Sequence, residues 1–307
     1  MSASLTAARI AVLIPCLNEE VTISKVVQDF RKELPQATIY VFDNNSTDRT
    51  AELARAEGAV VIPEHKRGKG HVIAAMFRKV EADYYVMVDG DDTYSVAHVQ
   101  ALLQPLLDGE ADMTVATRLN EYEEESFRPL HVFGNNLVRS LVNWIFSSNL
   151  EDIMSGYRGF SQELVQNLPV LASGFEVETE MTIRVLDYGY TIQEVTVPYR
   201  ERPEGSFSKL NTFRDGFRVL YQIASIARSY KPILFFGVLA LFFGLIGLIA
   251  GGEVIVDYAV DGYVNKVPTA ILAVGCMLLC FGSIGIGAIL DTLNARFREV
   301  LRLLQRK

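Results

Sequence analysis

The sequence predicts an α/β protein with a mostly parallel, doubly wound sheet, followed by a segment that spans a membrane. Apolar strand-like runs alternate with amphipathic helical runs as far as about residue 198 of the 307-residue chain, and this alternation is typical of βαβ units. Closer to the C-terminal end, two long runs carry no charged side chain. Each is long enough to cross a hydrocarbon core roughly 30 Å thick.

The elements follow from apolar patterning and turn formers taken in order. The first strand should cover Arg9–Pro15, because Pro15 lacks the N–H that would continue the ladder. A helix is expected from Asn18 on, with apolar residues recurring on one face at Ile23, Val26, Val27 and Phe30. The same reasoning predicts strands over 38–42, 59–62, 84–88, 113–118 and 191–198. It also predicts a helix to Glu57 that Gly58 terminates, a helix opened by 66–70, and helices over 131–146 and 175–187. The last of these should present the acids Glu176, Glu178 and Glu180 to the ligand cleft. The single tryptophan, Trp144, is expected in the core rather than at a sugar-binding surface.

Three carboxylates follow the strand over 84–88 within four residues: Asp89, Asp91 and Asp92. Ligands of open α/β sheets bind beyond the carboxyl ends of the strands, so these acids lie where chemistry is expected. Carboxylates at i and i+2 around the tight turn that Gly90 permits can hold one Mg²⁺ or Mn²⁺. The alternative is an acidic turn that caps the next helix, and the motif alone does not separate the two interpretations.

Polar side chains also follow the other expected strands. Asn18 and Glu19 come after the first strand, Asp43 and Asn44 after the second, and Lys69 after the third. Four polar strand ends on one sheet edge predict a ligand cleft, and Lys69 between two glycines at a helix N-terminus suits an anion. Neither the P-loop spacing nor G-x-G-x-x-G after a strand is present, which disfavours P-loop nucleotide binding and NAD binding.

Four segments in this order resemble the successive motifs of glycosyltransferase family 2, whose members have the GT-A fold: Val12–Glu20, Phe42–Thr50, Arg67–Gly70 and Val88–Asp92. The resemblance extends to about residue 120. It implies that the nucleotide is bound by Pro15, Leu17, Asn18, Glu19, Asp43, Asn45, Lys69, Asp89 and Gly90. It also implies that Asp89 and Asp91 hold Mg²⁺ or Mn²⁺ on the donor diphosphate, with Asp91 among the catalytic residues. Thr93 stands where polyprenyl-phosphate members often have Gln.

Two later segments resemble the polyprenyl-phosphate and dolichyl-phosphate sugar transferases of that family: Asp152–Phe160 and Tyr199–Leu210. The second carries arginine, serine and lysine donors on a glycine-containing loop, which suits a phosphate group. The resemblance implies that the acceptor phosphate is bound by Arg118, Arg202, Ser206, Ser208 and Lys209, of which Arg118, Arg202 and Lys209 count as catalytic. Whether Ser206 or Ser208 corresponds to the family serine stays open.

The C-terminal part divides into three expected segments after a catalytic domain over 1–209. Residues 210–231 form a basic amphipathic helix, which fits a membrane interface better than a core. Residues 232–292 hold two uncharged spans, Pro232–Gly252 and Val267–Leu290, for which a buried soluble hairpin is the disfavoured alternative. Residues 293–307 form a basic tail. Basic flanks on both sides predict that the catalytic domain and tail are cytoplasmic, at the inner or plasma membrane, and no signal peptide is expected. Glycines in the spans are compatible with a homo-oligomer.

The expected function is inverting, metal-dependent transfer of a sugar from a UDP- or GDP-linked donor to undecaprenyl or dolichyl phosphate, giving a lipid-linked sugar. A phosphate monoester is already ionised at neutral pH, so no strong general base is required. The alternatives are a nucleotide-binding membrane scaffold without activity and a glycosyltransferase with another lipid acceptor. The Q-x-x-R-W motif of processive synthases and the glycine-rich first loop of nucleotidyltransferases are both missing. The net charge of −8 disfavours nucleic acid as a partner.

Overall fold

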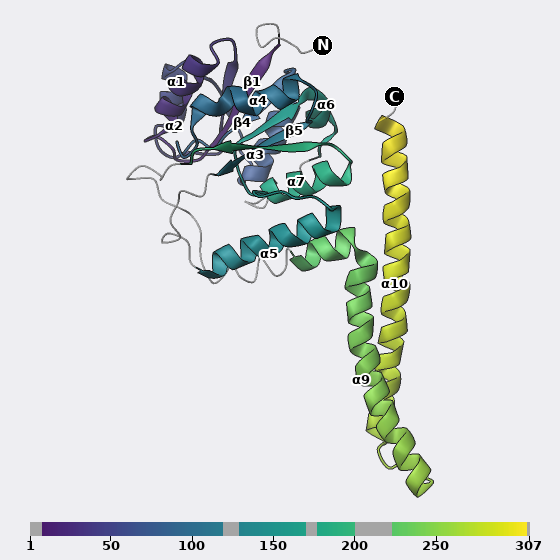
Figure 1. Cartoon of the computed structure of the whole chain (residues 1–307). Helices are drawn as coiled ribbons and strands as arrows, with labels where there is room; N and C mark the ends of the chain where they lie inside the picture. Colours follow the sequence, from purple (N-terminus) through teal and green to yellow (C-terminus); the bar gives the residue numbers. More distant parts are fainter. Residues whose placement is uncertain (1–7, 119–128, 170–176, 200–222, 306–307) are drawn as a thin grey trace. The chain divides into compact units, whose positions relative to one another are not determined.

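The computed structural model of the chain describes residues 8–118, 129–169, 177–199 and 223–305 (Figure 1). The chain divides into two compact units, one formed by residues 1–132 and 142–210 and the other by residues 133–141 and 211–307. The first unit contains a seven-stranded sheet with the order β3-β2-β1-β4-β6-β5-β7. The second contains two long apolar helices.

The sheet is mostly parallel, as the sequence predicts. Its strands are β1 (Ile10–Cys16), β2 (Thr38–Asp43), β3 (Val60–Pro63), β4 (Tyr84–Met87), β5 (Met113–Arg118), β6 (Arg158–Ser161) and β7 (Ile192–Val197). The short strand β6 is antiparallel to both β4 and β5 and lies between them. The sequence patterns did not predict β6, because four residues are too few to show an apolar alternation.

Helices cover the sheet on both faces. They are α1 (Ile23–Glu33), α2 (Thr50–Ala56), α3 (Lys69–Lys79), the 3₁₀ turn η1 (Val96–His98), α4 (Val99–Leu107), α6 (Gln162–Asn167) and α7 (Val177–Asp187). A further helix, α5 (Pro129–Phe146), is shared between the two compact units. The expected start of α1 at Asn18 is wrong. Asn18 has a left-handed backbone with φ of 55°, which an α-helix does not accommodate. The next residues form a turn in which N of Thr22 donates to the carbonyl of Glu19 at 3.1 Å, and the helix begins at Ile23.

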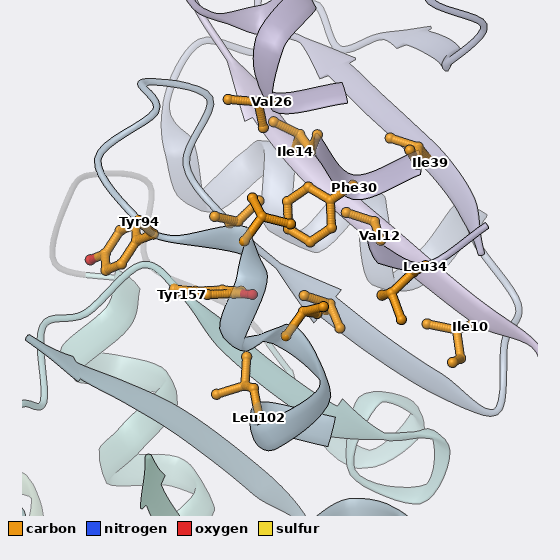
Figure 2. Packing of buried hydrophobic residues seen from close by; sticks show 14 of the residues in the cluster. Ile10, Val12, Ile14, Val26, Phe30, Leu34, Ile39, Tyr94, Leu102 and Tyr157 are labelled. Atoms are coloured by element: carbon orange, nitrogen blue, oxygen red, sulfur yellow. The ribbon is translucent and has the colours of Figure 1, made fainter. Parts of the chain in front are cut away.

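Successive residues of β1 point to opposite faces of the sheet and into two different hydrophobic clusters. Ile10, Val12 and Ile14 pack with residues of α1 and α4, as Figure 2 shows for Phe30 and Leu102. Ala11 and Leu13 pack with residues of α3, α6 and α7. The period of two along a strand therefore places α1 and α4 in one layer and α3, α6 and α7 in the other.

The side chain of Trp144 is 59% exposed, so the expectation of a core tryptophan is wrong. The buried face of α5 is formed by Val138, Val142 and Ile145. Trp144 follows Val142 by two residues, about 200° around a helix of 3.6 residues per turn, and therefore points away from that face. The apolar period predicted the helix correctly but did not determine which residues face inward.

Two helices of the second unit are long and apolar enough to cross a membrane, α9 (Pro232–Asp261) and α10 (Val267–Gln305). They run side by side (Figure 1), and small residues allow the close approach: a Cβ on Gly247 would lie 3.0 Å from Sδ of Met277. Both helices extend beyond the uncharged runs. Of the expected interfacial helix, residues 223–230 are helical, and residues 210–222 lie outside the described residues.

Candidate active site

The carboxyl ends of six strands meet at one edge of the sheet. β1 to β4 are parallel to one another, and β5 is parallel to β7. Because β6 is antiparallel to both β4 and β5, those two strands also run in the same direction. The segments that follow Cys16, Asp43, Met87 and Arg118 therefore start at a common edge, where open α/β sheets bind ligands.

The loops after β1 and β2 are tied to each other by hydrogen bonds. Oδ1 of Asn18 accepts from N of Thr47 at 2.8 Å, and N of Asn18 donates to Oγ of Ser46 at 3.0 Å. Glu19 adds a bond from its N to Oγ1 of Thr50 at 2.8 Å. Asn18 was predicted to bind the nucleotide, but its side-chain oxygen Oδ1 already accepts a hydrogen bond within the protein. Its neighbours Pro15, Leu17 and Glu19 are half-buried at the same edge.

The β2 loop is joined to the segment after β3 in the same way. Nδ2 of Asn45 donates to the carbonyl oxygens of Glu64 (3.3 Å) and His65 (3.1 Å), and Oδ1 of Asp43 accepts from N of Ser46 at 3.2 Å. Asn45 has a left-handed φ of 64°, which Asn tolerates better than most residues. The amide of Asn45, another proposed nucleotide ligand, therefore shapes the loop.

Gly90 allows the turn after β4 to pass close to β1. A Cβ on Gly90 would lie 2.8 Å from Sγ of Cys16, and the carbonyl of Gly90 accepts a 2.6 Å bond from Oγ1 of Thr22. Burial, with the nearby carboxylate of Glu19 adding to it, raises the pKa of the Cys16 thiol. Cys16 is therefore a neutral packing residue beneath this turn.

The second acid of the D-x-D motif, Asp91, and the adjacent Asp92 have different surroundings. Asp91 is 4% exposed, and its Oδ1 accepts from Oγ1 of Thr93 at 2.6 Å and from N of Thr93 at 3.3 Å. The neighbouring Asp92, with φ of 57°, forms an ion pair with Lys25 at 2.7 Å. Thr93, at the position where related enzymes often have Gln, thus orients the carboxylate of Asp91.

Lys69, at the start of α3, lies between two carboxylates. Its Nζ is 2.5 Å from Oδ1 of Asp89 and 2.5 Å from Oε1 of Glu178, which comes from the first turn of α7. Burial alone would lower the pKa of Lys69, but the charges of Asp89 and Glu178 outweigh burial and raise it. Lys69 is thus a cation held at the motif that is predicted to bind a metal.

Glu178 was not among the residues assigned to the site from the sequence. The helix over 175–187 was expected to present Glu176, Glu178 and Glu180 to the ligand, and the sequence could not distinguish between them. In the structure Glu178 contacts Lys69, whereas Glu180 pairs with Arg184 at 2.7 Å. The rotation of α7 about its axis therefore determines which of these acids reaches Lys69.

The other oxygen of Asp89 lies against Gly156, in the segment before β6. A Cβ on Gly156 would be 2.2 Å from Oδ2 of Asp89. The same segment is held by Oη of Tyr94, which accepts from N of Gly156 at 3.1 Å and contacts Oγ of Ser155 at 3.3 Å. Tyr94 follows the D-x-D turn, so this turn and the segment before β6 are fixed to each other.

Arg118, at the end of β5, makes a bidentate ion pair with Asp152. Nε and Nη2 of Arg118 lie 2.6 and 3.1 Å from the two carboxylate oxygens, and the guanidinium carbon is 5.5 Å from the ring centre of Tyr199. Asp152 is fixed by Glu194, which accepts hydrogen bonds from N of Glu151 and N of Asp152. The pKa of Arg118 is raised, because the charge of Asp152 outweighs the lowering by burial.

Arg158, the first residue of β6, is fully buried with 0% exposure. Its guanidinium donates to the carbonyls of Ser155 (2.7 Å) and Ile153 (2.8 Å) and to Oγ1 of Thr182 (2.8 Å). The segment that carries Asp152 and Gly156 therefore wraps around this side chain. The sequence indicated Arg158 only as part of a family-like motif, because no pattern reveals that an arginine is buried.

The carboxylates fit a Mg²⁺ or Mn²⁺ that shares its coordination with a substrate. Within the described ranges, no group of three or more His, Cys, Asp or Glu side chains is arranged to enclose a metal. A complete protein cage is not required, because Mg²⁺ commonly binds one or two carboxylates together with substrate phosphates. Asp89 and Asp91 carry carboxylate oxygens of this kind on either side of Gly90.

Four of the predicted phosphate ligands lie outside the described residues: Arg202, Ser206, Ser208 and Lys209. Of the phosphate ligands expected from the sequence, the structure therefore places Arg118. Arg118 lies at the same sheet edge as Asp89, because β5 and β4 run in the same direction.

The family model described as "Glycosyl transferase family 2" matches residues 11–168. The chain is 30% identical over 278 residues to "Glycosyltransferase AglJ" of Haloferax volcanii, covering 89% of this chain and 91% of that protein. It is 29% identical over 217 residues to "Dolichyl-phosphate hexose transferase" of the same organism, covering 71% of this chain and 93% of that protein.

A solved structure with the same fold is glucosyl-3-phosphoglycerate synthase from Mycobacterium tuberculosis in complex with Mn²⁺, uridine diphosphate and glucosyl-3-phosphoglycerate. The TM-score is 0.59 at 24% sequence identity, covering 72% of this chain and 82% of that one. This similarity shows the fold alone. With the family match over residues 11–168 and the AglJ similarity over 89% of the chain, it establishes the class: the protein is a GT-A-fold enzyme that belongs to glycosyltransferase family 2.

Proposed function

We propose that the protein transfers one sugar from a UDP- or GDP-linked donor to the phosphate of a membrane polyprenol, with Mg²⁺ or Mn²⁺ and with inversion at the anomeric carbon. The observation that carries the proposal is the position of two charged groups at one sheet edge. Asp89, which pairs with Lys69, directly follows β4, and Arg118, which pairs with Asp152, is the last residue of β5. One group suits a metal-bound diphosphate and the other a second phosphate.

On the donor side, Asp89 and Asp91 would hold the metal on the diphosphate, and Lys69 would contact the phosphate oxygens. The loops after β1 and β2 would surround the nucleoside through Pro15, Leu17, Glu19 and Asp43. The loops themselves would be shaped by Asn18, Asn45 and Gly90. The side-chain amides of Asn18 and Asn45 make hydrogen bonds within the protein, and Gly90 packs closely against Cys16. The bound metal would act as a Lewis acid that neutralises charge on the leaving diphosphate. The Mn²⁺ and uridine diphosphate bound to the mycobacterial synthase support this assignment.

On the acceptor side, Arg118 would hold the attacking phosphate together with Arg202, Lys209 and Ser206 or Ser208. Nε and Nη2 of Arg118 are directed at Asp152, so the phosphate would be met by the remaining Nη1 group. The phosphate is ionised near neutral pH, and the protein's task is to place its oxygen in line with the anomeric carbon. The dolichyl-phosphate hexose transferase relative supports a lipid phosphate as acceptor.

The apolar helices α9 and α10 would anchor the enzyme where such a lipid resides. Basic residues flank this pair before Pro232 and after Asp291, and positive flanks favour the cytoplasmic side. We therefore place the catalytic domain and the C-terminal tail in the cytoplasm. Close glycine packing between α9 and α10 leaves homo-oligomerisation through the membrane segment as a further expectation.

The test is sugar transfer from radiolabelled UDP- and GDP-sugars into organic-extractable lipid, using the purified full chain in detergent with polyprenyl phosphate and Mn²⁺ or Mg²⁺. Metal-dependent label in the lipid, reduced at least a hundredfold by Asp91→Asn and by Asp89→Asn, supports the proposal and names the donor. Asp83→Asn, in the surface pair with Arg9, is the matched control and should retain activity. Transfer to a different lipid, or retention of the donor's anomeric configuration, would contradict the proposal.

A further inference from the structure

Lys69 and its two carboxylate partners are unequally exposed. The side chain of Glu178 is 7% exposed, that of Lys69 14%, and that of Asp89 28%. The backbone at Glu178 is also tied to a buried side chain. The main-chain carbonyl of Glu178 accepts a bond from Oγ1 of Thr182 at 3.0 Å, and the same Oγ1 accepts from buried Arg158 at 2.8 Å. Glu178 is therefore an anchored partner of Lys69, and Asp89 is the more accessible one.

The anchoring also comes from the layer to which both helices belong. Val177, Met181 and Val185 of α7 and Val72 and Met76 of α3 are buried in the same hydrophobic cluster on one face of the sheet. The backbone positions of Lys69 and Glu178 are thus set by packing rather than by their ion pair. Either side chain could lose its charge without freeing its helix.

A divalent cation bound to Asp89 would compete with Lys69 for the same carboxylate oxygen. The ammonium nitrogen lies 2.5 Å from Oδ1 of Asp89, and a bound Mg²⁺ would need to be about 2.1 Å from a carboxylate oxygen. Oδ2 faces Gly156, where even a methyl group would not fit. Two cations on one oxygen repel strongly in a partly buried site. Lys69 must therefore leave Asp89 when a metal binds there.

We propose that Glu178 is a positioning residue for donor binding: it holds the ammonium of Lys69 in the site while a metal-bound diphosphate replaces that ammonium on Asp89. This inference rests on the proposed function and assigns a role to a residue outside the predicted set. In the free protein Lys69 has two carboxylate partners. In the donor complex it has Glu178 and the diphosphate, so its charge stays next to the phosphate oxygens without the entropy cost of ordering a free lysine.

Glu178 could instead act as a general base, because it is a carboxylate at the sheet edge. Its Oε1 is already engaged by the ammonium group of Lys69, so this oxygen is occupied before any substrate binds. The two roles predict different results. A base affects the catalytic rate and leaves nucleotide affinity unchanged, whereas a positioning residue affects nucleotide affinity and does so only while Lys69 is present.

The experiment measures binding of UDP and GDP to the full chain by calorimetry, with and without Mn²⁺, for wild type, Glu178→Gln, Lys69→Gln and the double variant. Binding of Mn²⁺ alone is followed by its electron paramagnetic resonance signal. The control is Glu180→Gln, two residues along the same helix and paired with Arg184. Thermal unfolding of every variant verifies that it is folded.

We expect Glu178→Gln to weaken Mn²⁺-dependent nucleotide binding about tenfold, the effect of losing one charge-assisted contact. This loss should disappear in the Lys69→Gln background, because the two residues act as one unit. Lys69→Gln should bind Mn²⁺ alone more tightly than wild type, since Asp89 is released. Glu180→Gln should match wild type within twofold.

Unchanged nucleotide affinity in Glu178→Gln, or an equal loss in the presence and absence of Lys69, would overturn the inference and leave the proposed function intact. Failure of the wild-type chain to bind either nucleotide with Mn²⁺ would overturn both. If Glu178→Gln does not fold, the Mn²⁺ affinity of Lys69→Gln tests the inference instead. An affinity no tighter than that of wild type would contradict competition at Asp89.

Discussion

Asp89 and Gly156 lie in van der Waals contact at the boundary between the D-x-D turn and the segment before β6. A single added carbon on Gly156 would come within 2.2 Å of Oδ2 of Asp89 and 2.8 Å of its Cγ. Tyr94 also joins the two segments, because its Oη accepts a hydrogen bond from the backbone N–H of Gly156. The position of the first acid of the motif therefore depends on a glycine that lies 67 residues later in the sequence.

Gly156→Ala should reduce sugar transfer at least tenfold, because the new methyl group displaces the carboxylate of Asp89. The loss should be accompanied by weaker Mn²⁺-dependent nucleotide binding, measured by calorimetry. Gly252→Ala is the control, since a Cβ there has no neighbour within 4 Å. Full activity in Gly156→Ala would mean that Asp89 is free to move and that the contact has no functional weight.

Arg118→Lys should raise the KM for polyprenyl phosphate at least tenfold while donor affinity stays within twofold of wild type. A lysine cannot make the bidentate contact with Asp152 and present a further N–H group to a phosphate at the same time. Acceptor-dependent initial rates provide the measurement. Arg9→Lys is the control, because Arg9 forms an exposed pair with Asp83. An effect on the donor KM instead would move Arg118 to the donor side.

Arg158→Met should destabilise the first compact unit by about 2 kcal/mol. The carbonyls of Ile153 and Ser155 and the hydroxyl of Thr182 would lose their donor, and each buried unpaired group costs about 1–3 kcal/mol, partly offset by no longer burying a charge. Urea unfolding followed by fluorescence measures the change. Arg49→Met, in an exposed i,i+3 pair with Glu52, should change stability much less than Arg158→Met does. Equal or greater stability of Arg158→Met would show that burial of the charge outweighs its hydrogen bonds.

The loop between β2 and α2 should lose stability in acid through Asp48. Burial tends to raise the pKa of Asp48, but bonds from Oγ1 and N of Thr50 and from N of Glu20 outweigh burial and lower it. A lowered folded-state pKa contributes stability above the unfolded pKa of about 4, and that stability is lost as the pH falls through the lower folded value. The difference in melting temperature between wild type and Asp48→Asn should therefore be largest near pH 7 and vanish near pH 2. If the difference in melting temperature did not depend on pH, the Asp48 carboxylate would not be stabilised in its ionised form by these hydrogen bonds.

Most of the sheet and both apolar helices could be predicted because their signals are local. The strand predicted over 113–118 is β5 with the same bounds, and the alternation along β1 is followed by burial on two faces. Helix periods were also correct, and the face predicted for α1 is the buried one, but the start of α1 and the side of α5 that carries Trp144 were not predicted. Asn18 adopts a left-handed backbone that delays α1, and Trp144 lies on the exposed side of α5.

The sequence by itself determined the fold class, the family and the common sheet edge at which Asp89, Lys69 and Arg118 gather, because repeating polarity patterns and short motifs are encoded in neighbouring residues. Only the tertiary structure decided that Asp89 rests on Gly156, that Arg118 pairs with Asp152, and that Glu178 rather than Glu180 meets Lys69. These partners lie 34 to 109 residues apart in the chain. Their meeting depends on how β6 enters the sheet and how α7 is rotated against it, and packing of the whole domain sets both.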